Sequence, residues 1–296
     1  LECVNNLKQI GLALHNYESA NGSFPPPKVY SANTYAPNDP GGVGLVLDHT
    51  AFTLALNYLE QGPLHAAYNF SLPSCAALNG SINATLVGGP DGYLANTTVV
   101  TTKLTAFLCP SDPGPTSLTT TSRSYLMTNG QKSSYMLAAG YYYENYNPPF
   151  LAGQKPVETS IFSGTDWVTK IAEITDGTSN TVFGGESPLV KWSDNYGPFW
   201  GAGAWTSTHG RAMMPEHPQV SCWMPNGRPL VGPGQQVASN PKNLSYAWTF
   251  GSKHPGGVNM VFADGTVKFI KNSINPYAWW GIFTMYNGEI LSADMY

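Results

Sequence analysis

The residues of this chain that could perform the most varied chemistry are its four cysteines, and they stand far apart. They occupy positions Cys3, Cys75, Cys109 and Cys222. A zinc site usually shows closely spaced ligands such as Cys-x-x-Cys, and the sequence contains no such pair. Four cysteines of an exported chain can pair in three ways, and the spacing does not select one of them. We therefore expect two disulfides and leave their pairing open.

Other metal-binding residue types also lack a recognised motif. The six histidines are scattered, and the sequence contains no His-Glu-x-x-His. The run 176–180, Asp-Gly-Thr-Ser-Asn, is similar to a calcium loop but lacks the alternating ligands of an EF-hand. A turn that caps backbone amides is the preferred interpretation. We expect no metal and no cofactor; the alternative is calcium, held by Asp176, Asn180 and Glu186.

No sequence pattern indicates catalysis. Residues 184–188, Gly-Gly-Glu-Ser-Pro, differ from the Gly-x-Ser-x-Gly turn of hydrolases. Phosphate-binding and dinucleotide-binding fingerprints do not occur either. Serine, histidine and aspartate are all present, but nothing in their spacing points to a triad. The sequence therefore predicts a protein that is not an enzyme.

Aromatic side chains are the stronger candidates for a binding surface. They gather in stretches rich in Gly, Pro and Asn, where a core would favour aliphatic residues. Tyr and Trp are enriched at subunit interfaces, and such side chains also stack on sugar rings. We favour an interface and keep a carbohydrate site as the alternative. The candidates are Tyr141, Tyr142, Tyr143, Tyr146, Trp192, Trp200 and Trp205.

Asn-x-Ser/Thr sequons are the candidates for glycosylation. They cluster in residues 69–98, a stretch of small, polar and Gly-rich sequence. Together with the Ser/Thr-rich run 116–124, this stretch predicts an exposed insertion over about 69–124. The candidate asparagines are Asn21, Asn69, Asn79, Asn83, Asn96 and Asn243.

The composition narrows the class of protein. Only 11% of the 296 residues are charged, compared with about 25% in an average soluble protein. The net charge is −4 and no basic run occurs, which argues against nucleic acid as a partner. No apolar stretch reaches the roughly 18–20 residues that a membrane span needs. A surface of Asn, Ser, Thr and Tyr suits a secreted or cell-surface protein.

The elements that would position these residues begin with a helix over 1–20. Its apolar residues recur every three or four positions and form one stripe: Cys3, Leu7, Ile10, Leu14 and Tyr17. Asn21-Gly22 is a suitable left-handed end, and the prolines that follow cannot continue a helix. The helix has neither an initiator Met nor an N-cap, so we expect a missing upstream segment.

The rest of the chain, 21–296, is predicted to form a single globular body with long loops. Thr50 can cap a second helix over 51–61, which Gly62-Pro63 would break, and 99–108 is expected to be a strand. Short β-prone runs follow at 125–127, 134–138, 167–171, 181–183 and 247–250. Asp264-Gly265 between alternating apolar residues predicts a hairpin over 258–270. A helix followed by a sheet without β-α-β alternation predicts an α+β fold.

Four segments resemble one family. They are the opening helix with its Gly-Ser-Phe-Pro-Pro exit (3–26), 107–113 (Phe-Leu-Cys-Pro-Ser-Asp-Pro), 174–181 (Ile-Thr-Asp-Gly-Thr-Ser-Asn-Thr) and 254–270, which begins His-Pro-Gly-Gly. They occur in the same order as in planctomycete-type DUF1559 proteins and span nearly the whole chain. Two of the cysteines, Cys3 and Cys109, lie within them.

The resemblance implies a type IV pilin-like or pseudopilin-like fold, in which the N-terminal helix packs on an antiparallel β-sheet. In that family a prepilin signal and a hydrophobic stem precede the helix, and this chain shows neither. The implied function is a non-catalytic structural subunit of an extracellular filament or cell-surface assembly. Its partner would be a homopolymer of the same chain, with glycans in addition and the membrane only through the missing stem. The alternative is a secreted or cell-surface carbohydrate-binding module.

Overall fold

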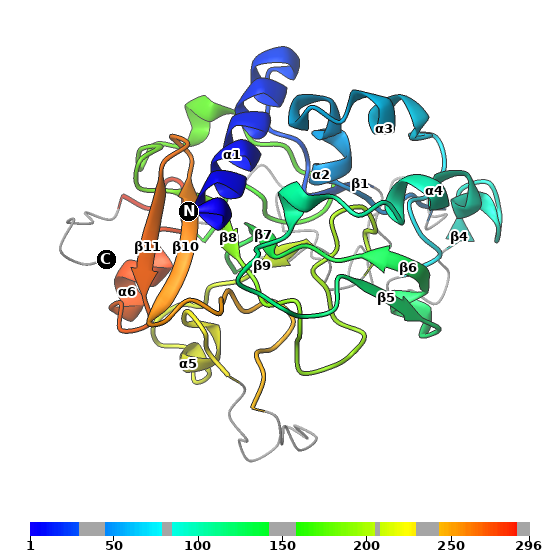
Figure 1. Ribbon diagram of the computed structural model, residues 1–296. Coiled ribbons are helices and arrows are strands. Elements are labelled where there is room, and N and C mark those ends of the chain that lie inside the picture. Colours follow the sequence, from blue (N-terminus) through cyan, green and yellow to red (C-terminus); the bar gives the residue numbers. More distant parts are fainter. Residues whose placement is uncertain (30–44, 79–84, 142–157, 205–207, 229–242, 289–296) are drawn as a thin grey trace.

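Helix α1 (Glu2–Asn21) lies across one face of a five-stranded sheet (Figure 1). The computed structural model describes residues 1–29, 45–78, 85–141, 158–204, 208–228 and 243–288. Within these ranges no helix is both long enough and apolar enough to cross a membrane. The helix ends at Gly22, whose φ of 77° is the left-handed conformation expected there.

The central sheet has the strand order β11-β10-β8-β7-β9. Its strands pair antiparallel, except that β7 and β9 run parallel. Helix and antiparallel sheet together confirm the α+β class. The strands are β7 (Tyr135–Ala138), β8 (Val182–Glu186), β9 (His209–Gly210), β10 (Gly257–Phe262) and β11 (Val267–Lys271).

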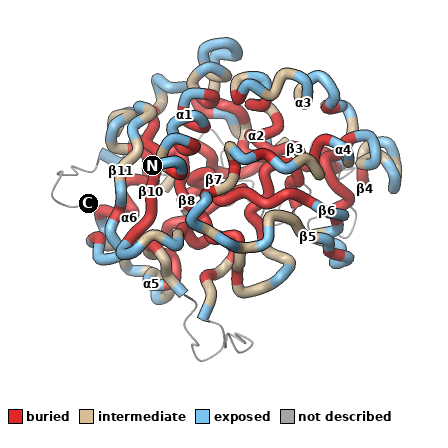
Figure 2. Tube along the Cα trace, in the orientation of Figure 1, coloured by how far each residue is buried: buried red, intermediate tan, exposed pale blue. Residues whose placement is uncertain are grey.

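The predicted stripe of α1 is the face that packs on this sheet. Leu7, Ile10 and Leu14 are buried in the largest hydrophobic core, together with residues of β7, β8 and β10. Gly11 lies so close to the sheet that an added Cβ would stand 3.0 Å from Cγ2 of Val261. Figure 2 shows the result, a helix with a buried inner face and an exposed outer face.

The hairpin prediction is also confirmed. Strands β10 and β11 pair antiparallel from Gly257–Lys271 to Val261–Val267. Gly265 takes the positive φ of 81° that the tight turn requires. The preceding Asp264 accepts hydrogen bonds from the backbone and hydroxyl of Thr266, which closes the turn. Of the other β-prone runs, 134–138 and 181–183 correspond to β7 and β8, whereas 167–171 and 247–250 form no strand.

The expected second helix is divided into shorter pieces. Thr50 caps α2 as predicted, because its side chain accepts a hydrogen bond from Thr53 N–H. The helical region is interrupted at Glu60 and Gln61, directly before Gly62-Pro63, and a short helix, α3, begins at Gly62. Proline is tolerated in a first helical turn because the N–H that it lacks needs no partner there. The pieces are α2 (Ala51–Leu54), a 3₁₀ turn (Leu56–Leu59) and α3 (Gly62–Ala67).

Over the residues that the structure describes, 69–78 and 85–124, the stretch is not the exposed insertion that its composition predicts. Val99 and Phe107 belong to the core that α1 covers. Cys75 and Ala77 belong to a smaller core that also contains Met127 and Phe199. The run 99–108 is not a strand either, because it contains the end of a helix and a 3₁₀ turn. The elements of this part of the chain are a 3₁₀ helix at Gly92–Asn96, α4 (Thr97–Val100) and a 3₁₀ turn at Thr105–Phe107.

The remaining elements are short and surround the central sheet. Three two-stranded sheets pair β1 (Lys28–Val29) with β3 (His49–Thr50), β2 (Leu45–Val46) with β4 (Thr85–Leu86), and β5 (Ser117–Thr120) with β6 (Met127–Gln131). Single turns of 3₁₀ helix lie at Arg123–Tyr125 and Ile171–Glu173. Helices α5 (Val220–Trp223) and α6 (Pro276–Gly281) complete the described chain, and α6 contributes to a second core that also contains Phe250 and Met260.

Candidate functional site

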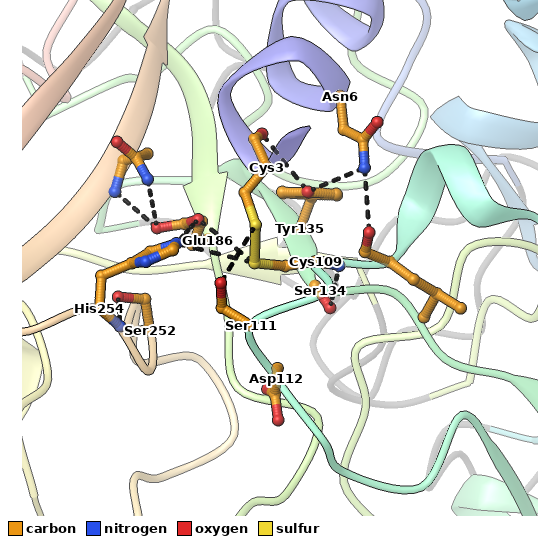
Figure 3. The surroundings of a disulfide bond; sticks show 12 residues. Cys3, Asn6, Cys109, Ser111, Asp112, Ser134, Tyr135, Glu186, Ser252 and His254 are labelled. Carbon is orange, nitrogen blue, oxygen red and sulfur yellow. Dashed lines mark hydrogen bonds and ion pairs between the residues drawn. A yellow bond between two sulfur atoms is a disulfide. The ribbon is translucent and has the colours of Figure 1, made fainter. Parts of the chain in front are cut away.

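A disulfide joins the first turn of α1 to the body of the protein. Cys3 is bonded to Cys109, 106 positions further along the chain (Figure 3). The expectation of two disulfides is therefore wrong, since Cys75 and Cys222 are buried and form no disulfide. Burial raises the pKa of the Cys75 thiol to about 12, and the Asp48 carboxylate beside it acts in the same direction.

Several hydrogen bonds hold the two sides of the disulfide in place. The Asn6 side chain, one turn after Cys3, donates to Leu108 O at 2.9 Å and to the Tyr135 hydroxyl at 3.3 Å. The Cys109 N–H donates to the Ser134 hydroxyl oxygen at 3.0 Å. The start of α1 is thus fixed to the loop before Cys109 and to β7 by polar contacts as well as by the covalent bond.

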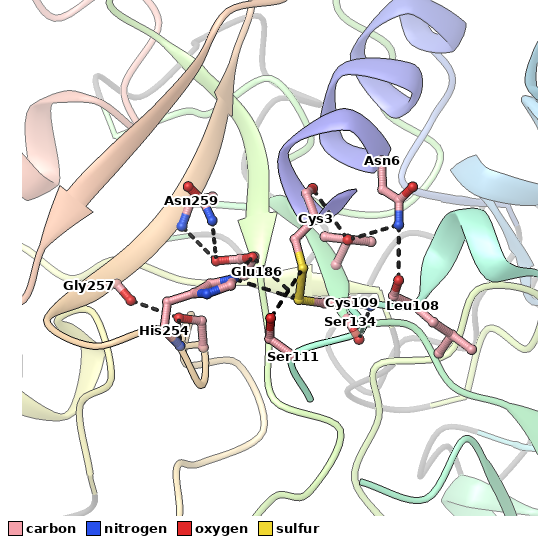
Figure 4. A network of polar contacts seen from close by, with 12 residues as sticks. Cys3, Asn6, Leu108, Cys109, Ser111, Ser134, Glu186, His254, Gly257 and Asn259 are labelled. Carbon is pink, nitrogen blue, oxygen red and sulfur yellow. Dashed lines mark hydrogen bonds and ion pairs between the residues drawn. A yellow bond between two sulfur atoms is a disulfide. The ribbon is translucent and has the colours of Figure 1, made fainter. Parts of the chain in front are cut away.

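A carboxylate and an imidazole lie directly beside this disulfide. Glu186, the last residue of β8, is only 2% exposed, and its Oε1 lies 2.9 Å from Nε2 of His254. Its other oxygen, Oε2, accepts from the backbone N–H of Asn259 at 2.7 Å and from the Asn259 side chain at 3.1 Å (Figure 4). Both carboxylate oxygens therefore have a defined partner, and the orientation of the carboxylate is fixed.

The loop that carries His254 is ordered by its own short contacts. The His254 N–H donates to Oγ of Ser252, and the Ser252 hydroxyl donates to Gly257 O at 2.7 Å. His254 presents a quarter of its side-chain surface to solvent. A cavity of about 10 Å³, room for a single water molecule, adjoins Cys109 and Glu186.

The four side chains come together closely. Cys109 Sγ lies 3.7 Å from His254 Nε2 and 3.8 Å from Glu186 Oε1. Together with Cys3 Sγ, these three atoms form a group of four potential metal ligands, all within 4.8 Å of one another. An imidazole in this position can supply a proton to a thiolate that leaves when a disulfide is attacked. We refer to Cys3, Cys109, Glu186 and His254 as the disulfide site.

Three of the four segments that carry the family resemblance meet at this site. Cys3 belongs to the opening helix, Cys109 to 107–113 and His254 to 254–270. A family model described as "Protein of unknown function (DUF1559)" matches residues 1–277. The chain belongs to the DUF1559 family. No curated protein and no solved structure matches the chain.

In this DUF1559 protein the three residues proposed for calcium do not form one site, because Glu186 lies apart from the other two. Asp176 and Asn180 share one turn, where the Asn180 side chain donates to Asp176 O. The Asp176 carboxylate accepts from the backbone N–H groups of Asn287 and Gly288 at 2.8 and 2.9 Å. Glu186 instead belongs to the disulfide site. The Asp176 carboxylate therefore binds backbone amides, although those of a distant segment rather than those of its own turn.

The aromatic interface candidates differ in how far they are buried. Trp200 is wrong as a surface residue, because it is fully buried and stacks on Phe107 with ring centroids 5.7 Å apart. Tyr141 and Trp192 are half-buried, the first beside Arg211 and the second against Tyr246. Tyr142, Tyr143, Tyr146 and Trp205 lie outside the described residues.

One glycosylation candidate is also excluded by burial. Asn96 is fully buried, and its side chain donates to the carbonyl groups of Asn69, Leu72 and Pro73. A glycan could not be attached there without breaking these bonds. Asn21, Asn69 and Asn243 are exposed, so they stay predictions, and Asn79 and Asn83 lie outside the described residues.

Proposed function

We propose that this protein is a non-catalytic structural subunit, which assembles with copies of itself into an extracellular filament or surface layer. The observation that carries the proposal is the construction of α1. Its inner face is packed on the sheet and its first turn is bonded to Cys109. Its outer face is left available along the whole helix (Figure 2).

The outer face of α1 has the composition of an interface. Its exposed residues also recur every three or four positions, so they form a second stripe opposite the first. Leu12, in the middle, is 60% exposed. Charged side chains are few, so little charge would have to be desolvated when a neighbour packs there. The exposed residues of α1 are Glu2, Asn5, Lys8, Gln9, Leu12, Asn16, Ser19, Ala20 and Asn21, and two of them, Glu2 and Lys8, are charged.

Rigidity of the helix supports the same proposal. Association costs free energy when the surfaces have to be ordered on binding, and a fixed surface avoids much of that cost. The disulfide and the Asn6 hydrogen bonds hold one end of α1, and Leu7, Ile10 and Leu14 hold its inner face. An outer face held in this way can meet a second copy without rearrangement.

The same bond supports a location outside the cell. Disulfides persist in oxidising compartments and are rare in the cytosol. The low proportion of charged residues agrees with a surface that glycans and neighbouring subunits cover. We therefore place the assembled protein on the cell surface or in the extracellular space.

The experiment is electron microscopy and sedimentation of the purified protein. We expect ordered fibres or layers in the wild type, and loss of order in Leu12→Glu, which places a charge in the middle of the outer face. Leu94→Glu is the matched control, because Leu94 is 55% exposed on a different surface. Raising the salt concentration should change the assembly little, since screening acts on charges.

Two results would refute the proposal. One is a wild-type protein that stays monomeric at high concentration, and the other is an equal effect of Leu12→Glu and Leu94→Glu. A monomer that is retained on a glycan column would instead favour the alternative, a carbohydrate-binding module.

A further inference from the structure

We propose that the disulfide site becomes a zinc site when its disulfide is reduced. The ligands would be the two sulfur atoms, one imidazole nitrogen and one carboxylate oxygen, from Cys3, Cys109, His254 and Glu186. Thiolate and imidazole ligands favour zinc over calcium or magnesium, and two sulfurs with two lighter donors suit its tetrahedral geometry.

The distances at the site already approach those of a zinc tetrahedron. Zinc binds sulfur at about 2.3 Å and nitrogen or oxygen at about 2.0–2.2 Å, so sulfur and a lighter ligand stand about 3.5 Å apart. Cys109 Sγ lies 3.7 Å from His254 Nε2 and 3.8 Å from Glu186 Oε1. Nitrogen and oxygen ligands of one zinc ion stand about 3.4 Å apart, and here they are 2.9 Å apart.

The surroundings hold the ligands as a metal site requires. Metal-binding carboxylates are usually hydrogen-bonded through the oxygen that does not face the metal. Oε2 of Glu186 accepts two hydrogen bonds from Asn259, which leaves Oε1 turned toward Cys109 and His254 (Figure 4). Cys3 lies in the first turn of α1, where the helix dipole favours a thiolate. His254 is partly exposed, so an ion can reach the site from solvent.

The reaction balances with a dithiol as the reductant. The dithiol transfers two electrons and two protons, its own sulfurs become a disulfide, and the Cys3–Cys109 bond is replaced by two thiols. Zinc then binds both sulfurs as thiolates and releases the two protons to solvent. The two sulfur atoms move apart, and the metal takes over the connection between α1 and the body.

The test uses the full chain, reduced with a trialkylphosphine, because a dithiol would compete for the metal. The phosphine takes the oxygen of a water molecule and becomes the phosphine oxide, and the two protons of that water go to the two sulfur atoms. Zinc is added, excess zinc is removed, and the bound metal is counted by elemental analysis. We expect one zinc ion per reduced chain and none per oxidised chain. Cobalt in place of zinc should give the charge-transfer absorption of thiolate ligands.

The variants separate this site from other thiols and histidines. His254→Ala and Glu186→Gln should each weaken zinc binding by at least about tenfold. His217→Ala, a histidine away from the site, should leave it unchanged. Cys3→Ser/Cys109→Ser retains Cys75 and Cys222, which form no disulfide, and should bind no zinc.

The proposal is overturned if the reduced, folded wild type binds no zinc, or binds equally in His254→Ala and Glu186→Gln. If reduction unfolds the wild type, zinc should restore its circular dichroism spectrum, and failure to do so also overturns the proposal. Neither readout depends on whether the protein assembles, so the proposed function is tested separately.

Discussion

Removal of the Cys3–Cys109 bond is predicted to lower the stability of the protein strongly. The perturbation is the double substitution Cys3→Ser/Cys109→Ser, which leaves no unpaired thiol at the site. The bond closes a loop with a sequence separation of 106. In the chain-entropy treatment, opening such a loop returns about 16 cal/mol/K to the unfolded chain, or about 4.8 kcal/mol at 25 °C.

The folded state should change much less than the unfolded state. The Asn6 hydrogen bonds to Leu108 O and Tyr135, and the buried stripe of α1, do not involve the sulfur atoms. Residual structure in the unfolded chain reduces the full entropic value, so the expected loss is about 2–5 kcal/mol. The largest part of this loss arises in the unfolded ensemble.

The assay is equilibrium urea unfolding, followed by tryptophan fluorescence at neutral pH. The double variant should unfold at a lower urea concentration than the wild type. Its m value should be higher, because an unfolded chain without the cross-link exposes more surface. Cys222→Ala is the control, since it removes a cysteine that forms no disulfide; its loss should stay near the average of about 1 kcal/mol for a single substitution.

A loss below about 1 kcal/mol in the double variant, with an unchanged m value, would refute the reasoning. It would mean that the bond does not restrict the unfolded chain, or that it does not form in the purified protein. Reduction of the wild type with a phosphine, in the absence of zinc, should reproduce the effect of the double substitution.

Three further predictions concern the core, the thiols and the pH dependence. Leu14→Ala should cost about 2–5 kcal/mol in urea unfolding because Leu14 is buried on the inner face of α1, whereas Leu12→Ala, on the exposed face, should cost less than about 0.5 kcal/mol in the monomer. Thiol labelling without reduction should modify no cysteine in the native protein and two, Cys75 and Cys222, after denaturation; labelling of four would contradict the disulfide. Burial lowers the pKa of Lys132 to about 8, while that of an unfolded-state lysine is about 10.4. Between these values the unfolded state binds more protons at Lys132, so this residue alone contributes a rise in the free energy of unfolding of up to about 1.4 kcal/mol per pH unit, which is read as the difference in slope between the wild type and Lys132→Met. Lys132→Met should reduce this rise, and an unchanged slope would contradict the assignment.

The sequence predicts those elements whose signals are local. The stripe from Leu7 to Leu14 repeats at helical spacing, and Asp264-Gly265 lies between alternating residues, so neighbouring positions suffice for both. The run 99–108 shows the limit of this approach. Its β-branched Thr and Val residues favour a strand. The segment nevertheless forms helical turns, in which Val99 and Phe107 are buried in the core that α1 covers.

The disulfide site could not be predicted from spacing, because its residues come from four distant segments. Glu186 is 68 positions from His254 and 77 from Cys109. The useful signal was the set of segments that resemble the family, which contains three of the four residues. Glu186 lies outside these segments. Similarly, the Gly- and Pro-rich surroundings of Trp200 indicate a surface loop, whereas the fold stacks that ring on Phe107 in the core.

The covalent closure between Cys3 and Cys109 also determines how the molecule would respond to mechanical force. Tension applied at the beginning of α1 passes through the sulfur–sulfur bond into Cys109, so the intervening chain lies outside the load path. That chain would add about 350–380 Å if it were pulled straight. An oxidised subunit is therefore a short, stiff link under tension, while a reduced, metal-free one could lengthen by this amount before it parts.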